Sequence, residues 1–315
     1  MYKAFYGLRI EPFGVSPDPD FLVMTPAVRE ALASLSYALY NRRGIVSLTG
    51  EVGTGKTTII AKLMRWLQRM NYASALIFNA RLSVPDFFDV MMADFGIECE
   101  SREKGQRLLK LNEWLLQHAR LGQTAVVIVD EAQGLSSELL EELRLLTNLE
   151  TNTHKLLQIV LCGQPELEAK LREPELRQLR QRIMVRCTTQ PLSAEQTQEY
   201  VNERLRRAGA DGTPIFTPDA LQAVWRYSGG IPRNINLLCE HSLINAFADQ
   251  QRPVAEQTVH LVAQEFGLDE ATAIAARAAD ENRATPLTRV GPASAKIFAA
   301  DNPAGLAAVG DPRKI

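Results

Sequence analysis

The stretch Gly50-Glu51-Val52-Gly53-Thr54-Gly55-Lys56-Thr57 decides the fold of this 315-residue chain. It matches the phosphate-cradling pattern G-x-x-x-x-G-K-[ST] at every position. The five residues before it, Ile45-Val46-Ser47-Leu48-Thr49, have the apolar character of a short buried strand. The residues from Thr58 to Met70 have the apolar period of an amphipathic helix. A strand, a glycine-rich loop and a helix in this order predict a site for the phosphates of a nucleotide.

The chemistry of such a loop predicts its ligands. Its glycines let backbone N–H groups turn toward phosphate oxygens, and the helix that follows adds free N–H groups and partial positive charge. Lys56 is then expected to reach the β- and γ-phosphates of ATP, and the Thr57 hydroxyl is expected to ligate Mg²⁺. The predicted nucleotide-binding residues of the loop are Gly50, Glu51, Val52, Gly53, Thr54, Gly55, Lys56, Thr57 and Thr58.

The composition indicates which general classes of protein the chain can belong to. Hydrophobic residues make up 46% of the chain and charged residues 23%, which is typical of a soluble globular protein. The net charge of -2 gives no overall attraction to nucleic acid or anionic lipid. The four scattered cysteines form no C-x-x-C pair and predict free thiols. Without a signal-peptide pattern or an apolar run of roughly 20 residues, we expect a cytoplasmic protein without a membrane span.

Strands and helices alternate as far as residue 190. Besides the strand at residues 45–49, the chain predicts apolar strands at 73–78, 125–131, 156–162 and 183–189. Apolar strands separated by helices indicate a parallel sheet covered on both faces, so the fold class is α/β. After Pro191 the pattern predicts only helices, at 193–208, 217–227, 232–248 and 254–266.

Four segments follow from these patterns. We expect residues 1–25, rich in aromatics and prolines, to lie extended over a domain surface as a linker. The α/β core is predicted to cover 26–190 and an all-α domain 191–268. The Ala-rich residues 269–315 are predicted to be disordered.

Two carboxylates complete the predicted active site. Asp130 and Glu131 end the most apolar strand, and ligands of open α/β sheets bind at the carboxyl ends of strands. We expect Asp130 to hold the Mg²⁺ shell through water and Glu131 to activate the attacking water as general base. Gln164, after the fourth strand, is expected to contact the γ-phosphate or that water. Asn79 either holds Glu131 by a hydrogen bond or simply ends its strand.

Two arginines are further candidates. Among the charged residues of 166–186, Arg182 is our first choice for a side chain that projects into a neighbouring subunit's ATP site, and Arg180 is the second. Arg233 stands in the first turn of a predicted helix, where a cation opposes the helix dipole. Its position therefore suggests a nearby anion, and the γ-phosphate is the candidate.

These motifs together resemble a known family. The glycine-rich loop, Asp130-Glu131, Gly163-Gln164-Pro165-Glu166-Leu167 and Gly229-Gly230-Ile231-Pro232-Arg233-Asn234-Ile235-Asn236 look like AAA+ ATPases, a P-loop NTPase group. More narrowly, Phe5-Tyr6-Gly7-Leu8, Pro12-Phe13, Pro17-Asp18-Pro19 and Phe21-Leu22 resemble the N-terminus of ExeA/GspA-type ATPases. The resemblance runs from about residue 1 to residue 267.

The resemblance implies a five-stranded AAA+ core followed by a helical lid, with ATP at their junction and a homo-oligomer as the active form. It also implies a role for each candidate: Lys56 and Thr57 as Walker A ligands, Asp130 and Glu131 as the Walker B pair, Gln164 as sensor 1, Arg182 as the arginine finger and Arg233 as sensor 2. The family is associated with general (type II) secretion and related pilus or exopolysaccharide systems. Secretion members continue into a membrane span and a peptidoglycan-binding part, which this sequence lacks. We therefore expect an ATPase recruited to the inner membrane by an envelope-apparatus partner.

Two other functions fit the loop less well. Transposition ATPases of the MuB/TniB type share the core and lid and assemble on DNA. The near-neutral charge and the absence of an added helix-turn-helix count against DNA binding here. A small-molecule kinase would not need the Asp-Glu pair or the Gly-Gly-Ile-Pro-Arg lid.

Overall fold

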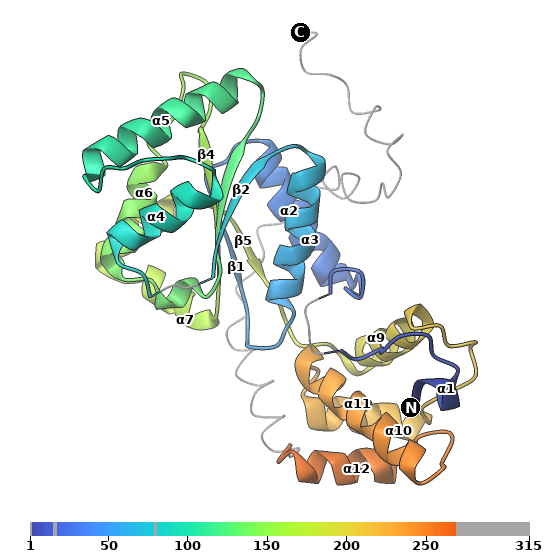
Figure 1. The fold of residues 1–315 in the computed structure, drawn as a ribbon. Coiled ribbons are helices and arrows are strands. Elements are labelled where there is room, and N and C mark those ends of the chain that lie inside the picture. The colour runs from blue at the N-terminus through green and yellow to red at the C-terminus, as the bar shows by residue number, and fades with distance from the viewer. Residues whose placement is uncertain (1, 15–17, 79–80, 269–315) are drawn as a thin grey trace. The chain divides into compact units, whose positions relative to one another are not determined.

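The computed structural model describes residues 2–14, 18–78 and 81–268, which form two units (Figure 1). The sheet unit contains the described residues of Pro26–Gly50 and Ile59–Thr188. The helical unit contains those of Met1–Thr25, Glu51–Thr58 and Thr189–Thr285. Asn79 and the predicted tail 269–315 lie outside the described residues.

The sheet unit is built on five parallel strands in the order β2-β3-β4-β1-β5. The strands are β1 (Ile45–Thr49), β2 (Ala73–Ile77), β3 (Ala125–Val129), β4 (Leu157–Gly163) and β5 (Ile183–Thr188). Strands β1, β3 and β4 are buried along their whole length, as their largely apolar sequences predict. The edge strand β5 alternates between buried and exposed residues instead. The predicted five-stranded parallel sheet is confirmed.

Helices cover both faces of this sheet (Figure 1). One face carries α2 (Pro26–Tyr40) and α3 (Lys56–Arg69), and the other carries α4 (Val84–Asp94), α5 (Lys104–Arg120), α6 (Ser137–Leu146) and α7 (Pro165–Leu171). On α6, the buried leucines at 139, 143 and 146 recur at helical spacing and pack into the core against the sheet. Ser136 caps this helix by accepting a hydrogen bond from the backbone N–H of Leu139 at 3.1 Å.

The charged segment between β4 and β5 is broken rather than continuous. After α7, Pro174 opens a short 3₁₀ turn, η2 (Pro174–Leu176), and α8 (Arg177–Arg182) then leads into β5. Proline cannot donate a backbone hydrogen bond, so the helix cannot run through it. None of the helices in the described part of the chain is long and apolar enough to cross a membrane.

The helical unit holds the four helices expected after Pro191. They are α9 (Ala194–Arg207), α10 (Pro218–Ser228), α11 (Pro232–Ala248) and α12 (Glu256–Glu265). Ser193 and Gln196 form a reciprocal capping box at the start of α9. Pro218 and Pro232 occupy first-turn positions, where the missing N–H has no helical acceptor to lose.

The N-terminal segment is more than an extended linker. Residues Tyr2–Tyr6 form a short helix, α1, and Tyr2, Tyr6 and Phe13 are buried in the core of the helical unit. The aromatic side chains explain the difference, because burying each of them removes a large apolar area from water. The Tyr2 hydroxyl also donates to Glu240 Oε1 on α11 at 2.7 Å.

A buried arginine holds this segment to α9. The Arg204 side chain is 7% exposed, and its Nε donates to the carbonyl oxygen of Pro12 at 2.6 Å. A second guanidinium nitrogen donates to the Tyr200 hydroxyl at 2.7 Å. The guanidinium lies 5.0 Å from the ring centroid of Phe21 and 5.9 Å from that of Phe13. Aromatic faces and hydrogen-bond acceptors together compensate for the loss of water around this buried charge.

We expect Arg204→Met to lower the free energy of unfolding of the helical unit by about 2–4 kcal/mol, because it removes two charged hydrogen bonds from a buried site. Urea unfolding followed by circular dichroism measures the change. Arg206→Met is the matched control, since the Arg206 side chain is 70% exposed on the same helix. Equal unfolding midpoints for the two variants would contradict the anchoring role.

Candidate functional site

The phosphate loop, residues 50–57, connects β1 to α3. The backbone N–H of Gly50 donates to the carbonyl oxygen of Gly163 at 3.3 Å, which extends the pairing of β1 with β4 into the loop. Gly53 and Gly55 have φ angles of 83° and 96°, in the region that side-chain-bearing residues rarely adopt. The loop therefore needs glycine at both positions to take this path.

The loop packs against the first turn of α11 in the helical unit. The backbone N–H of Arg233 donates to the carbonyl oxygen of Gly53 at 3.2 Å. A Cβ atom on Gly53 would lie 2.8 Å from Arg233 Cβ and 2.9 Å from Ile231 Cγ2. Thr54 adds a hydroxyl contact with Thr189 at 2.7 Å. The structure thus brings together two parts of the predicted site, the phosphate loop and Arg233, whose side chain is exposed.

Lys56 and Thr57 begin α3, where the sequence predicts the phosphate and metal ligands. Lys56 is 7% exposed, and its Nζ donates to the carbonyl oxygen of Glu51 at 2.9 Å. The ammonium is therefore held over the backbone of its own loop. Thr57 is exposed, and its hydroxyl is a hard oxygen ligand of the kind that Mg²⁺ prefers.

Asp130, the second predicted Mg²⁺ ligand, follows β3 directly. Its backbone N–H donates to the carbonyl oxygen of Ile77 at 2.9 Å, so the residue is fixed by the sheet. Its Oδ1 accepts from the N–H of Glu131 at 2.9 Å. Within the residues that the structure describes, no group of three or more His, Cys, Asp or Glu side chains could hold a metal. A carboxylate and a hydroxyl suit Mg²⁺, which usually binds one or two protein groups together with substrate phosphates.

Glu131 has an unusual backbone conformation. Its φ and ψ angles of 53° and 35° place it in the left-handed region, which is sparsely populated for residues other than glycine and asparagine. Its exposed carboxylate accepts a hydrogen bond at Oε2 from Gln164 Nε2 at 3.1 Å. The structure therefore brings the predicted base together with the predicted sensor.

Gln133 is part of the same cluster and was not predicted from the sequence. It lies in the 3₁₀ turn η1 (Ala132–Gly134), and its Nε2 donates to the same Oε2 of Glu131. Its Oε1 accepts from the backbone N–H of Gln164 at 3.0 Å. No sequence pattern signals this contact, because residues two apart in a helical turn do not normally face each other.

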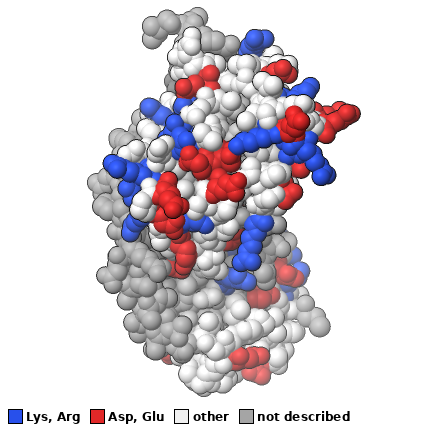
Figure 2. Space-filling view, turned by 90° about the vertical axis from the view of Figure 1, so that its left-hand side faces the viewer, with Lys and Arg blue, Asp and Glu red and all other residues white. Residues whose placement is uncertain are grey.

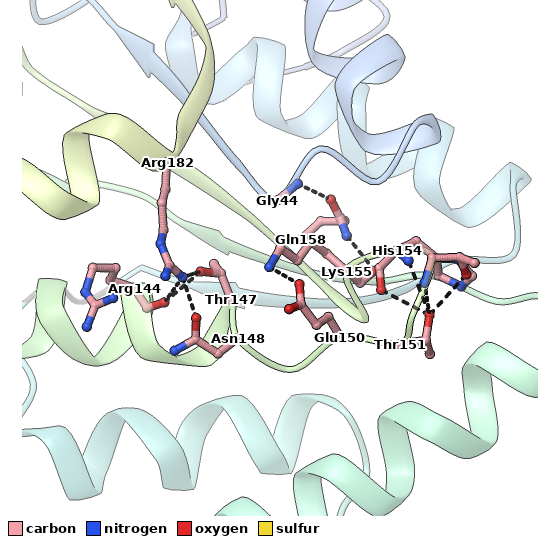
Figure 3. A network of polar contacts seen from close by, with 11 residues as sticks. Gly44, Arg144, Thr147, Asn148, Glu150, Thr151, His154, Lys155, Gln158 and Arg182 are labelled. Carbon is pink, nitrogen blue, oxygen red and sulfur yellow. Dashed lines mark hydrogen bonds and ion pairs between the residues drawn. The ribbon is translucent and has the colours of Figure 1, made fainter.

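Arg182 does not contact Glu131 or Gln164 and lies instead at the C-terminal end of α6 (Figure 3). One of its guanidinium nitrogens donates to Thr147 Oγ1 at 2.8 Å, to Asn148 Oδ1 at 2.6 Å and to the carbonyl oxygen of Arg144 at 3.2 Å. It thereby satisfies acceptors at the C-terminal end of α6. Nearby, the guanidinium of Arg144 holds the pKa of the Glu141 carboxyl below its usual range.

The two candidate arginines, Arg182 and Arg180, lie at the end of the sheet opposite to Glu131. Arg182 directly precedes the first residue of β5, whereas Glu131 follows the end of β3, and the strands are parallel. At about 3.3 Å per residue, a strand as long as β5 separates the two edges by roughly 16 Å or more. Arg180, half-buried in the last turn of α8, shares this edge. Neither arginine is placed to serve the carboxylates of its own chain.

Comparison with known proteins identifies the family of the chain. Residues 40–171 match the family model described as an AAA domain. The chain is 46% identical over 267 residues, 84% of its length, to General secretion pathway protein A of Aeromonas hydrophila. That match covers 48% of the relative, so the chain spans about half the length of this curated protein. The predicted resemblance to ExeA/GspA-type AAA+ ATPases is confirmed.

Solved structures support the fold. Cdc6p from Pyrobaculum aerophilum is similar with a TM-score of 0.62 and 17% identity, over 82% of this chain and 72% of that one. The ORC2 protein of Aeropyrum pernix is similar with a TM-score of 0.60 and 16% identity, over 81% of this chain and 71% of that one. At these identities the likeness concerns the fold alone, which is the AAA+ P-loop NTPase fold predicted from the sequence.

We expect Gly53→Ala to weaken binding of a fluorescent ATP analogue by about tenfold or more, because the added Cβ overlaps Arg233 and Ile231 at a positive φ. Titration of the purified protein measures the affinity. Gly122→Ala is the control, since Gly122 also has a positive φ of 77° but nothing lies within 4 Å of its added Cβ. Equal affinities for the two variants would show that the contact with α11 has no part in nucleotide binding.

Proposed function

The chain is a relative of General secretion pathway protein A that carries an AAA domain, and on this premise we propose that it hydrolyses ATP to remodel or assemble a protein apparatus of the cell envelope. One observation carries the proposal most directly. The Glu131 carboxylate is held by Gln164 at the same sheet edge where β1 runs into the phosphate loop. A positioned carboxylate at this edge is what hydrolysis of a bound triphosphate requires.

In the proposed reaction, Lys56 and the N–H groups of the phosphate loop bind the β- and γ-phosphates of ATP. Glu131 accepts a proton from water while the water oxygen attacks the γ-phosphorus. The bond to the β–γ bridging oxygen breaks, and ADP and inorganic phosphate leave. Asp130 and the Thr57 hydroxyl would hold Mg²⁺, which supplies charge neutralisation on the phosphates when bound. The hydrogen bond from Gln164 orients the Glu131 carboxylate, and this limits the positions from which water can attack.

We further propose that Arg182 acts on the ATP of a neighbouring subunit in a homo-oligomer. Its position at the opposite edge of the sheet supports action in trans, since it cannot serve its own carboxylates. The acceptors of its own chain hold one guanidinium nitrogen and so restrict the direction of the side chain, and its other guanidinium N–H groups would be the ones to contact a phosphate. Such an arginine contributes about 10³–10⁵ in rate in other nucleotide hydrolases.

The helical unit is proposed to respond to hydrolysis through Arg233. Its exposed side chain extends from the first turn of α11, whose backbone is hydrogen-bonded to the phosphate loop. A cation in that turn is stabilised when an anion is bound and destabilised by the helix dipole when the anion is lost. Release of phosphate would therefore change the energy of α11 and drive motion of the unit as a lid.

The remodelled partner is proposed to be a protein of a general secretion, pilus or exopolysaccharide apparatus that recruits this chain to the cytoplasmic face of the inner membrane. The name of the relative supports this assignment. Assembly on DNA is the alternative partner. On the side of the sheet unit that carries α5, acidic and basic side chains are interspersed without an extended basic area (Figure 2). This face gives no support to DNA binding.

We expect Glu131→Gln to bind ATP normally but to lower the rate of ATP hydrolysis by about 10²–10⁴-fold, because the amide cannot accept the proton of water. Phosphate release from the purified protein measures turnover, and Glu138→Gln, an exposed first-turn glutamate on α6, is the control.

In cells that carry only the Glu131→Gln chain, we expect a loss of secreted protein in the medium. If this variant hydrolysed ATP at the wild-type rate, the assignment of Glu131 as the base would be wrong. If secretion and envelope assembly were normal in these cells, the proposed role in an envelope apparatus would be wrong.

Mixing two inactive variants tests action in trans. We expect Arg182→Ala and Glu131→Gln to be nearly inactive alone and to recover hydrolysis when mixed, because a mixed interface pairs an intact Glu131 with an intact Arg182. The recovered rate is measured against the mixing ratio, and thermal melting of Arg182→Ala checks that α6 remains folded. An Arg182→Ala protein that is folded and fully active would instead leave Arg180 as the candidate.

A further inference from the structure

Gln133 makes more contacts than its place in a three-residue turn requires. Its Nε2 donates to Glu131 Oε2, and its Oε1 accepts from the backbone N–H of Gln164 at 3.0 Å. Its own carbonyl oxygen accepts from Lys170 Nζ at 3.4 Å, and the same ammonium also binds the carbonyl oxygen of Leu135. One end of the Gln133 amide is therefore bound to Glu131, two residues earlier, while the other end and the turn itself are bound to Gln164 and Lys170 beyond β4.

These partners settle which way the amide faces. The backbone N–H of Gln164 can only donate, so the amide oxygen of Gln133 must face it. The NH₂ end then has to face Glu131, whose ionised carboxylate can only accept. A flipped amide would lose both hydrogen bonds and place oxygen against oxygen. The direction of the donor thus follows from the backbone N–H of Gln164, which comes directly after β4.

Close packing against Gly163 removes the remaining freedom. A Cβ atom on Gly163 would lie 2.7 Å from Gln133 Oε1, so the amide fills the space that a side chain would otherwise take. Because Gly163 ends β4 and accepts from Gly50 at 3.3 Å, the amide rests on the strand that pairs with β1. The Gln133 side chain is therefore seated on the part of the sheet from which the phosphate loop begins.

We propose that Gln133 is a positioning residue that aims the Glu131 carboxylate at the attacking water. Glu131 takes a left-handed backbone conformation, and two amides, from Gln133 and Gln164, donate to one of its oxygens. Both donors draw the carboxylate toward β4, the neighbour of β1 in the sheet. The inference rests on the proposed function, because it assumes that Glu131 is the general base.

Three variants test the inference in the 315-residue chain. Gln133→Leu removes the amide, and Gln133→Glu keeps its length and its acceptor but removes the donor. Gly163→Ala leaves both residues in place and displaces the amide by its added Cβ. In each we expect kcat for ATP hydrolysis to fall by about 10- to 100-fold, the effect of losing one hydrogen bond to a charged group. For the two Gln133 variants, KM for ATP should stay within about twofold, because the interaction acts on the reacting water and not on binding. Gly163→Ala is judged on kcat alone, because Gly163 also pairs with Gly50 at the start of the phosphate loop.

The double variants separate positioning from a general structural role. In a Glu131→Gln background, Gln133→Leu should cause no further loss of the residual rate, since it acts only through Glu131. Gln106→Leu is the matched control, because Gln106 also donates to a glutamate, Glu103 Oε2, at 3.2 Å but lies on the exposed face of α5. This variant should hydrolyse ATP as the wild type does.

The outcomes distinguish the two proposals. If Glu131→Gln is inactive while Gln133→Leu and Gln133→Glu keep the wild-type kcat, the positioning role is wrong and the base remains. A further loss in the double variant, or a raised KM with unchanged kcat, would also overturn the positioning role. If Glu131→Gln itself hydrolyses ATP normally, the assignment of the base is wrong and the inference ends with it.

Discussion

The hydrogen bond from Gly50 to Gly163 joins the two halves of the candidate site within the sheet unit. On one side it fixes the start of the phosphate loop to the end of β4. On the other, the missing side chain of Gly163 makes room for Gln133, which in turn holds Glu131. Because a Cβ atom at Gly163 would meet the Gln133 amide, glycine here serves both the loop and the carboxylate. A small shift of β4 would therefore change the positions of both the phosphate loop and the Glu131 carboxylate.

The parallel strands place the proposed functional groups at two opposite ends of the sheet, the carboxyl ends and the amino ends of the strands. All carboxyl ends point the same way, so Asp130, Glu131 and Gln164 gather at one edge without any contact that is specific to function. The amino ends gather Arg182 and the C-terminal end of α6 at the other edge (Figure 3). If Glu131 and Arg182 act as proposed, one copy of the chain would supply the base and the next would supply the arginine. Such an oligomer would be a heterologous, head-to-tail association.

Most of the phosphate loop groups with the helical unit although its neighbours in the sequence do not. Residues 51–58 cluster with the helical unit, whereas β1 before them and the rest of α3 after them belong to the sheet unit. Gly53 and Thr54 bind Arg233 and Thr189 there. The helical unit is itself stabilised by the N-terminal segment around Arg204, so residues far apart in sequence support the first turn of α11 together.

The sequence alone determined the order of elements, the parallel sheet and the chemistry of the loop. The reason is local: the glycine pattern, the apolar period and the capping residues of 45–70 and 193–248 each act within a few residues. It also indicated Glu131, Gln164 and Arg233 as candidates, because they follow strand ends or open a helix. Only the tertiary structure decided that Gln133 and Gln164 share Glu131, that Arg182 closes α6 and that Arg204 binds the N-terminal segment. Those contacts join distant residues, and their partners depend on how strands and helices pack in three dimensions rather than on any periodicity along the chain.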